Sequence, residues 1–378
     1  ILPAGSYTIR AYYNGEELSQ SVDLSANVGT SVIDYDVGSY SSTPGASINN
    51  RHDVDFKFDI QSVPVEAFYS HYYYYADMVD CFVLEVIKDQ DIAPRGSYTI
   101  PASYEGHSVG GLWYGSYGPG LTSVTIPDSV KGLSGTFSYC SGLLSADVPN
   151  SVRVFSDVFY NCIRLESVAI PSAVKEIGDH CFSGCCSLKS ATIPNGVTNI
   201  CSYAFQNCSS LTSIIIPNSV ESIGWDAFSG CSGLTSVTIP DSVSLMGPGV
   251  FANCNGLTNV NLSSSLTEIP DGAFSHCGNL QFVKIPGNVK VIDYGAFDCC
   301  KNLTTVEIDD GVTEIGSQAF AGCSCLTAIS IPPSVNVIRI LAFESLSVVF
   351  VAPGDTERVK ELLSNGGVSF VDKLQFVE

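Results

Sequence analysis

The sequence is poor in charged residues and especially poor in basic ones. Only 15% of its 378 residues are charged, with 17 Lys and Arg against 38 Asp and Glu, so the formal net charge is −21. Nucleic acids and anionic membranes bind basic surfaces, and this balance argues against both as the main partner. No apolar run approaches the ~18 residues of a membrane-spanning helix, while a hydrophobic content of 45% argues against general disorder.

Motifs of catalysis and metal binding are also missing. The five histidines are scattered, and none lies in a His-x-x-x-His pair or an equivalent metal spacing. Nothing resembles a nucleophile elbow, a phosphate-binding loop or a calcium-binding loop. Members of a catalytic triad converge in space rather than in sequence, so spacing alone does not settle that case. We expect no catalytic residue, no metal ion and no cofactor.

What the sequence does contain is a repeat with a period of 23 residues. A Phe recurs at this spacing after one first gap of 22, with Cys three residues later and Leu six residues later. One repeat is too short to bury a core of its own, so neighbouring repeats must stack into a continuous array. The repeated Phe residues are Phe137, Phe159, Phe182, Phe205, Phe228, Phe251, Phe274, Phe297, Phe320 and Phe343.

Each part of the repeat predicts a local structure. The segment Leu-x-x-Val-x-Ile is typical of a short strand with β-branched residues at alternate positions. The Pro that usually follows has no N–H for a strand ladder and ends the strand. The Asp, Asn or Ser after it favours a turn. Val-x-x-Ile-Gly then crosses the back of the coil, and its Gly is expected at a bend.

Residues 211–228 (LTSIIIPNSVESIGWDAF) contain the whole unit, which resembles the BspA-type leucine-rich repeat. The resemblance covers residues 97–352 and implies a solenoid with short strands on its concave face and an irregular or 3-10 convex side. It also implies a surface protein of the kind found in anaerobic bacteria, which adheres to a host or matrix component. The chain begins at Ile1 without a signal peptide, and we interpret it as a mature chain whose leader was removed.

The sequence divides into four segments. Residues 1–75 alternate with period two, carry the hairpin signal Asn14-Gly15 and resemble bacterial immunoglobulin-like modules. They predict a small β-sandwich-like domain or a segment that shares strands with the solenoid. Residues 76–120 are expected to form an N-terminal cap and a degenerate first repeat, with a strand near residues 81–87 that pairs with the cap hairpin. Residues 121–352 form the repeats, and residues 353–378 a C-terminal cap with a short helix.

Most of the 15 cysteines occupy one repeat position. Neighbouring turns place their side chains in parallel, so a whole column cannot pair into disulfides. Free Cys usually behaves as a small buried hydrophobe. We therefore expect a column of buried thiols at Cys140, Cys162, Cys185, Cys208, Cys231, Cys254, Cys277, Cys300 and Cys323.

The strands are expected to present a flat face of small hydroxyl side chains, two and four residues after each strand Leu. Phe282 and Ile215 depart from this pattern, and Phe282 beside Lys284 fits an anchor for a partner. The alternative is a lone exposed apolar residue, which is common on protein surfaces. The residues that we single out for partner binding on this face are Ile215, Thr238, Asn261, Phe282, Lys284 and Glu307.

An aromatic cluster in the degenerate first repeat is a second candidate contact patch. Trp113, Tyr114 and Tyr117 combine flat apolar faces with polar tips, which suits stacking on sugars or binding of peptides. The alternative is a bulky cap over the open end of the core.

Together these features predict a non-enzymatic interaction or adhesion protein of the cell surface or extracellular space, which presents its concave strand sheet to a protein or glycan partner. Two other classes stay open. A carbohydrate-active enzyme or enzyme subunit would place two carboxylates ~5–10 Å apart in an aromatic cleft. A structural surface-layer component would stack its solenoid ends head to tail.

Overall fold

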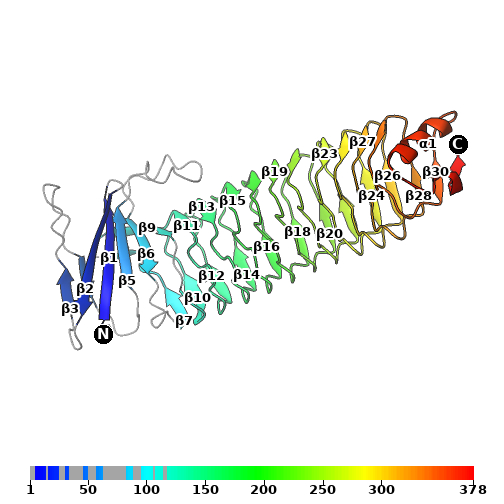
Figure 1. Cartoon of the computed structure of the whole chain (residues 1–378). Coiled ribbons are helices and arrows are strands. Elements are labelled where there is room, and N and C mark those ends of the chain that lie inside the picture. The colour runs from blue at the N-terminus through cyan, green and yellow to red at the C-terminus, as the bar shows by residue number, and fades with distance from the viewer. Residues whose placement is uncertain are drawn as a thin grey trace.

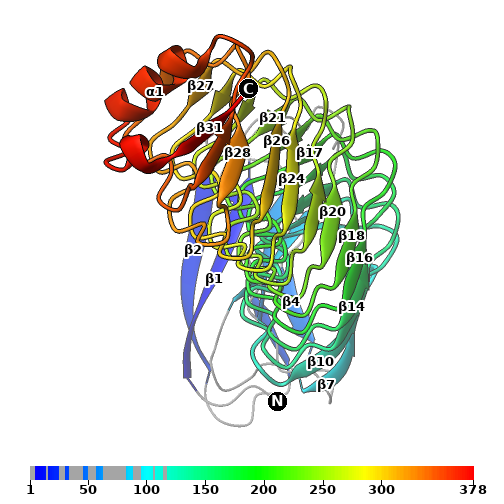
Figure 2. The ribbon, with the colours of Figure 1, turned by 90° about the vertical axis from the view of Figure 1, so that its right-hand side faces the viewer.

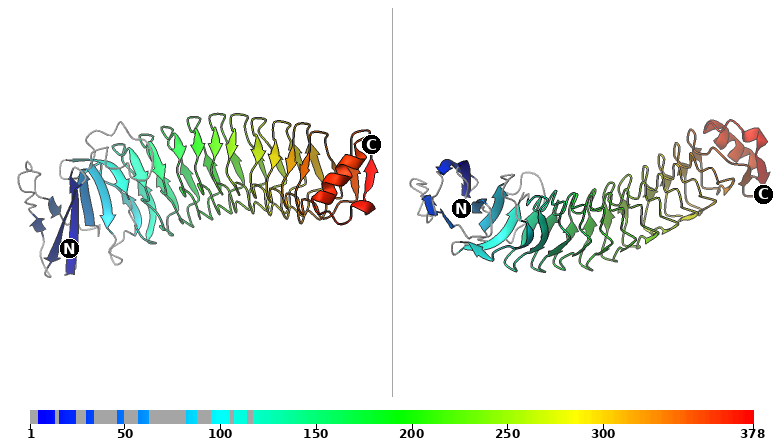
Figure 3. Two further views of the ribbon diagram at one scale, coloured as in Figure 1. Left: turned by 45° about the horizontal axis from the view of Figure 1, so that its top comes forward. Right: turned by 90° about the horizontal axis from the view of Figure 1, so that it is seen from below.

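The structure is a computed structural model that describes residues 95–378, apart from 105–106 and 114–116. Before residue 95 it describes the backbone of six strands, and the chain forms an elongated, curved solenoid beyond them (Figure 1 and Figure 3). These strands are β1 (Gly5–Tyr13), β2 (Glu16–Leu24), β3 (Thr30–Ile33), β4 (Ala46–Asn49), β5 (Lys57–Ser62) and β6 (Phe82–Ile87). No helix among the described residues is long and apolar enough to cross a membrane.

One side of the solenoid is a ladder of parallel strands, one from each Leu-x-x-Val-x-Ile segment. The ladder consists of three sheets. Within each sheet, residues at the same repeat position are register partners, as Ser213 is with Ser190 and Ile215 with Thr192. Side chains alternate between core and surface, so the predicted strands are confirmed. The ladder contains β7 (Gly96–Thr99), β10 (Leu121–Thr125), β12 (Ser145–Asp147), β14 (Ser167–Ala169), β16 (Ser190–Thr192), β18 (Ser213–Ile215), β20 (Ser236–Thr238), β22 (Asn259–Asn261), β24 (Phe282–Ile285), β26 (Thr305–Ile308), β28 (Ala328–Ser330), β30 (Val348–Phe350) and β31 (Gln375–Val377). The breaks between its sheets lie between β18 and β20 and between β26 and β28.

A second parallel ladder lies on the other side, where the sequence predicted irregular or 3-10 backbone. That prediction was wrong, because turns of equal length keep even two-residue segments in register with their neighbours. Ile200 pairs with Ile223, and both point into the core. This ladder contains β9 (His107–Trp113), β11 (Gly132–Ser134), β13 (Val154–Ser156), β15 (Glu176–Ile177), β17 (Asn199–Ile200), β19 (Ser222–Ile223), β21 (Leu245–Met246), β23 (Glu268–Ile269), β25 (Val291–Ile292), β27 (Glu314–Ile315) and β29 (Val337–Ile338).

The segment that joins the two ladders is a turn closed by one hydrogen bond. The N–H of Val220 donates to the carbonyl of Pro217 at 3.0 Å, and the same bond recurs in turns that carry the Pro. Where Ser263 replaces Pro, the N–H of Leu266 still donates to its carbonyl at 3.4 Å. The predicted turn is confirmed, and the turn geometry tolerates loss of the Pro.

The left-handed bends of each turn do not lie at the Gly that the sequence pointed to. A Cβ on Gly224 would lie 2.5 Å from the backbone nitrogen of Ser202, so this Gly permits close approach of neighbouring turns. Positive φ angles occur instead two residues before and two residues after each repeated Phe from Phe137 to Phe320. Around Phe205 they are 61° at Tyr203 and 58° at Asn207. The bend assignment therefore needed correction.

The core is organised around the column of repeated Phe side chains. From Phe137 to Phe343, consecutive rings are 5.0–5.7 Å apart between centroids and at most 20° from parallel. The N–H of Phe205 donates to the carbonyl of Ala227 on the next turn at 2.7 Å, and its neighbours repeat this bond. The Phe column thus aligns the turns as well as filling the core.

Strands of the N-terminal segment continue the second ladder instead of standing apart from it. The sheet order is β13-β11-β9-β6-β5-β1-β2, and β8 (Ser103–Tyr104) pairs with β9. The predicted strand near residues 81–87 and its pairing with the cap hairpin are confirmed. β1 and β2 pair antiparallel, as the Asn14-Gly15 signal predicted, although those two residues lie outside the described residues. An immunoglobulin-like fold for residues 1–75 stays a prediction.

The C-terminal end of the solenoid is covered by α1 (Thr356–Asn365), which is followed by a short 3-10 turn, η2 (Val371–Lys373). Val359 and Leu363 of the helix are buried, and the N–H of Leu341 donates to the carbonyl of Gly366. Figure 2 looks toward this end and shows α1 and β31 over the last turns. The predicted short helix is thus confirmed.

Replacing Phe228 by Ala should remove a ring that stacks on both Phe205 and Phe251 at 5.2 Å. The stacked turns cannot close around the cavity, so we expect the free energy of unfolding to fall by about 3–5 kcal/mol. Ile215→Ala is the control, because that side chain is 82% exposed, and it should change stability by less than about 0.5 kcal/mol. Urea denaturation followed by circular dichroism measures both variants, and equal midpoints would contradict this role of the Phe column.

Candidate functional site on the exposed face of the strand ladder

We call the outward surface of strands β10 to β30 the strand face. Its side chains lie two and four residues after each strand Leu, with an inward residue between them. In β20, for example, Ser236 and Thr238 are exposed while Val237 is 3% exposed. Half of these outward positions carry short hydroxyl side chains, which offer hydrogen bonds with little side-chain entropy to lose.

The structure places the predicted partner-binding residues together on this face. They come from the consecutive strands β18, β20, β22, β24 and β26, and all are exposed except Phe282, which is partly buried. All but Phe282 share the position four residues after the strand Leu, so they form one column. The amide of Asn261 donates to the hydroxyl of Thr238 at 3.2 Å, which ties two neighbouring turns. The column contains Ile215, Thr238, Asn261, Lys284 and Glu307.

Lys284 is less available to a partner than the sequence suggested. Its ammonium lies 3.1 Å from a carboxylate oxygen of Asp309, and its register partner on the next strand is Glu307. Both members of the ion pair are about half exposed, at 55% and 42%, so the pair itself stabilises the fold very little. Sequence reasoning missed this pairing because Asp309 stands where most repeats have Pro.

Two apolar side chains stand out on the strand face. Ile215 is 82% exposed, and Phe350 of β30 is 44% exposed. The sequence analysis missed Phe350. Its outward position could have been predicted, because it lies four residues after Leu346, as the other outward residues lie four after their strand Leu. The strand face therefore combines many hydroxyl groups with two exposed apolar side chains, whose contact with water is unfavourable.

One residue of the predicted aromatic contact patch, Tyr117, is part of the core. Tyr117 is 1% exposed, and its ring lies 5.0 Å from that of Phe137, between centroids. It takes the place of the repeated Phe in the degenerate first turn, so it closes the core and cannot contact a partner. Tyr114 and the side chain of Trp113 lie outside the described residues.

A different row of aromatic rings, which the sequence analysis missed, runs along the turns near the repeated Phe. Tyr139, Tyr160, His180 and Tyr203 contact one another in succession, at centroid distances of 5.1, 5.4 and 4.6 Å. His180 and Tyr203 are within 4° of parallel, so each covers a face of the other. Sugar recognition needs a free ring face, and in this row Tyr139, 59% exposed, comes closest to offering one.

The cysteine column is part of the core, as the sequence predicted. The thiol of Cys231 is fully buried and donates to the carbonyl of Phe205 at 3.2 Å. Burial raises the pKa of Cys231 to about 12, so the thiol stays protonated and unreactive. The same thiol-to-carbonyl bond recurs at Cys162, Cys185, Cys208, Cys254, Cys277, Cys300 and Cys323.

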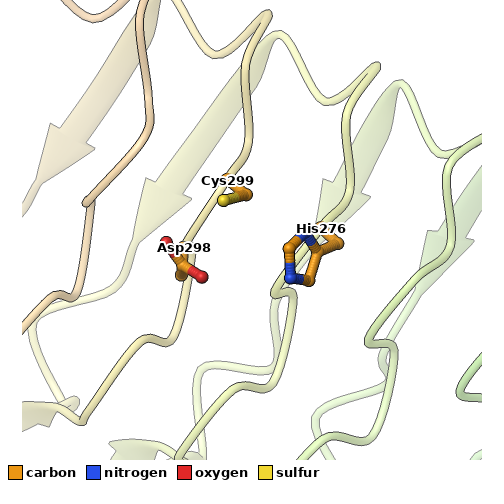
Figure 4. A group of neighbouring side chains, drawn as sticks. All are labelled: His276, Asp298 and Cys299. Carbon is orange, nitrogen blue, oxygen red and sulfur yellow. The ribbon is translucent and has the colours of Figure 1, made fainter.

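Spacing predicted no metal site, yet the structure brings three ligand-type side chains together. His276 lies on one turn, with Asp298 and Cys299 on the next (Figure 4). Their donor atoms all lie within 4.8 Å of one another, and no other group of this kind occurs among the described residues. The sequence signal is that His276 and Cys299 share a repeat position one period apart.

The chain matches the sequence model of one known protein family. The sequence model described as "BspA type Leucine rich repeat region" matches with six copies over residues 116–235, 177–304 and 246–355. No curated protein sequence matches the chain.

Several solved structures resemble the chain. A leucine-rich repeat protein from Bacteroides ovatus is 20% identical, with a TM-score of 0.46 over 85% of this chain and 98% of that one. A leucine-rich cell surface protein from Faecalibacterium prausnitzii is 24% identical, with a TM-score of 0.36 over 82% and 97% of the two chains. A leucine-rich repeat protein from Eubacterium ventriosum is 19% identical, with a TM-score of 0.41 over 70% and 90%.

The buried thiols should make the protein sensitive to alkali. Burial raises the pKa of Cys231 from 9.0 to about 12 and also raises that of Cys254. Above pH ~9 the unfolded thiols ionise and the folded ones do not, so the unfolded state binds fewer protons. Stability therefore falls as pH rises, by about 1.4 kcal/mol per pH unit for each such thiol.

Urea midpoints measured between about pH 8 and about pH 10 should show this steep loss. Cys231→Ala should flatten the slope by about one proton, whereas Cys325→Ala, at an exposed position, should leave it unchanged. An identical slope with and without Cys231 would mean that the thiol column does not control alkaline stability.

Proposed function

Because the chain belongs to the BspA-type leucine-rich repeat family, we propose that it is a non-enzymatic interaction protein of the cell surface or extracellular space. In this proposal the strand face binds a protein or glycan partner, and the rest of the solenoid holds that face rigid. The observation that carries the proposal is the exposure of Ile215, at 82%, within a face of short hydroxyl side chains.

The outward side chains of the strand face contribute little to the core. The inward residues of each strand fill the core, as Ile214 and Ile216 do at 7% and 6% exposure, so the outward positions between them accept many side chains without loss of folding. Leaving Ile215 in water forgoes about 1.5–3 kcal/mol of burial energy. A partner that covers this side chain recovers that energy, which favours a protein with an apolar group at the contact.

Phe282 and the neighbouring hydroxyls supply the rest of the contact in this proposal. Phe282 is partly buried on its own strand and is paired in register with Asn259 and Thr305. An aromatic ring held by its neighbours loses little entropy on binding, which is typical of interface anchors. Short side chains around it let a partner approach the sheet closely.

Two other functional classes have less support. The enzyme alternative was motivated by the aromatic cluster, and Tyr117 of that cluster is buried against Phe137. Head-to-tail assembly through the C-terminal end would have to displace α1, whose Arg358 donates to the carbonyl of Val335 and pairs with Asp355. The covered end favours a solenoid that terminates there.

Binding of the purified protein to immobilised extracellular matrix proteins and to a glycan array tests the proposal. For the partner found, Ile215→Asp and Phe282→Ala should each weaken binding at least tenfold, because each removes an apolar contact worth about 1.4 kcal/mol or more. Lys284→Ala should cost less than about threefold, since its ammonium is already paired with Asp309.

Tyr139→Ala, on the aromatic row of the turns, is the matched control and should leave affinity unchanged. Loss of binding in this variant with full binding in the strand-face variants would move the site to the turns. Absence of binding to any protein or glycan would remove the basis of the proposal.

A further inference from the structure

The cluster of His276, Asp298 and Cys299 lies apart from the strand face, on the turns that lead from the second ladder back to the strands. His276 follows Phe274 by two residues, and Cys299 follows Phe297 by two. The N–H of His276 donates to the carbonyl of Asp298 at 2.7 Å, so a backbone bond fixes the two turns against each other at this point.

The backbone sets both side chains in the same orientation. His276 and Cys299 have φ angles of 59° and 58°, and the residues at this repeat position are left-handed on the neighbouring turns as well. Side chains at one repeat position therefore stack above one another. Figure 4 shows the imidazole, the carboxylate and the thiol gathered on adjacent turns.

The distances between the donor atoms fit a single small cation after modest side-chain rotation. The three donors lie within 4.8 Å of one another. A tetrahedral ion with bonds of about 2.0–2.3 Å needs its ligands ~3.3–3.8 Å apart. Closing this difference takes movement of about 1 Å, which rotation of partly exposed side chains supplies.

The fold does not require these residue types. At the position of His276 and Cys299, neighbouring turns have Asn253 and Gly322, and at the position of Asp298 the preceding turn has Ser275. A Cβ on Gly322 would lie 3.0 Å from the sulfur of Cys299, so this Gly leaves room beside the thiol. Three ligand-type residues thus coincide at one place where the repeat accepts ordinary polar or small ones.

The donor chemistry selects the class of ion. Calcium and magnesium prefer oxygen ligands, whereas imidazole and thiolate together favour borderline transition metals, zinc above all. We propose that His276, Asp298 and Cys299 bind one zinc-class divalent ion through nitrogen, oxygen and sulfur, with a fourth coordination position open to solvent. Three protein ligands and one free position leave the ion accessible to an exogenous donor.

Titration of the reduced full-length protein with Zn²⁺ by calorimetry, and with Co²⁺ by absorption spectroscopy, tests this site. We expect one ion per chain and a sulfur-to-cobalt charge-transfer band in the near ultraviolet, with no displacement by excess Mg²⁺. Failure to bind Zn²⁺ and Co²⁺, or binding that Mg²⁺ reverses, would overturn the proposal.

Substitutions taken from the repeat itself keep the turns intact. His276→Asn and Cys299→Asn introduce the residue that Asn253 supplies at the same position, and Asp298→Ser introduces the one at Ser275. Each should weaken Zn²⁺ binding by more than about 100-fold, because loss of a ligand exceeds the 10–100-fold effect of losing its supporting group. Cys299→Asn should also abolish the charge-transfer band.

Cys186→Ser and Cys325→Ser are the controls, since both thiols are exposed and lie on other parts of the turns. They should leave affinity and spectrum unchanged, and loss of binding in either would place the metal elsewhere. The strand-face variants Ile215→Asp and Phe282→Ala should retain full metal binding, so failure of the metal site and failure of the proposed partner contact are distinguishable.

Discussion

The structure depends on hydrogen bonds between equivalent positions of neighbouring turns. Phe205 illustrates these bonds, because both its N–H and its carbonyl are paired. Its N–H donates to Ala227 on the next turn at 2.7 Å. Its carbonyl accepts from the N–H of Cys208 at 3.2 Å on its own turn and from the thiol of Cys231 at 3.2 Å on the next. A buried carbonyl has two acceptor sites, and here both are filled. This explains why the position holds Cys and not Ala, which fits the space but leaves one acceptor unmet.

The same constraint explains what the sequence could and could not predict. The 23-residue period assigns every residue a position in the repeat. The outward positions of Ile215 and Asn261 could therefore be predicted by counting from the strand Leu, and so could that of Phe350 by counting from Leu346. The second ladder did not follow, because two-residue strands such as β19 arise from the stacking of turns and not from local propensity. Contacts that depend on side-chain direction also escaped, including the ion pair of Lys284 with Asp309.

The bends illustrate a signal that was present but misassigned. The conspicuous Gly of Ile-Gly serves close packing, as the 2.5 Å approach at Gly224 indicates. The left-handed positions instead hold mainly Gly, Asn, Asp and His, which tolerate positive φ, although Tyr, Cys, Gln and Leu also occur there. Asn and Gly alternate at one of these positions on successive turns, as at Asn207 and Gly230. The reason is packing, since a Cβ on Gly230 would lie 2.3 Å from the side-chain oxygen of Asn207. Recognition of this repeat position would also have placed His276 next to Cys299, which lies one period later.

Free thiols and the extracellular location that we propose are compatible for a physical reason. Oxidation proceeds through the thiolate and needs access to it. Burial raises the pKa values of Cys231 and Cys277 to about 12 and closes off both sulfurs. Each thiol is also engaged as a donor to a Phe carbonyl, so its oxidation would break a bond that aligns two turns. Cys299 differs because its side chain is only partly buried and its sulfur lies beside His276 and Asp298. The cysteine column therefore stabilises the fold, whereas Cys299 lies at a bend near the surface, where it is positioned to bind the metal ion that we propose.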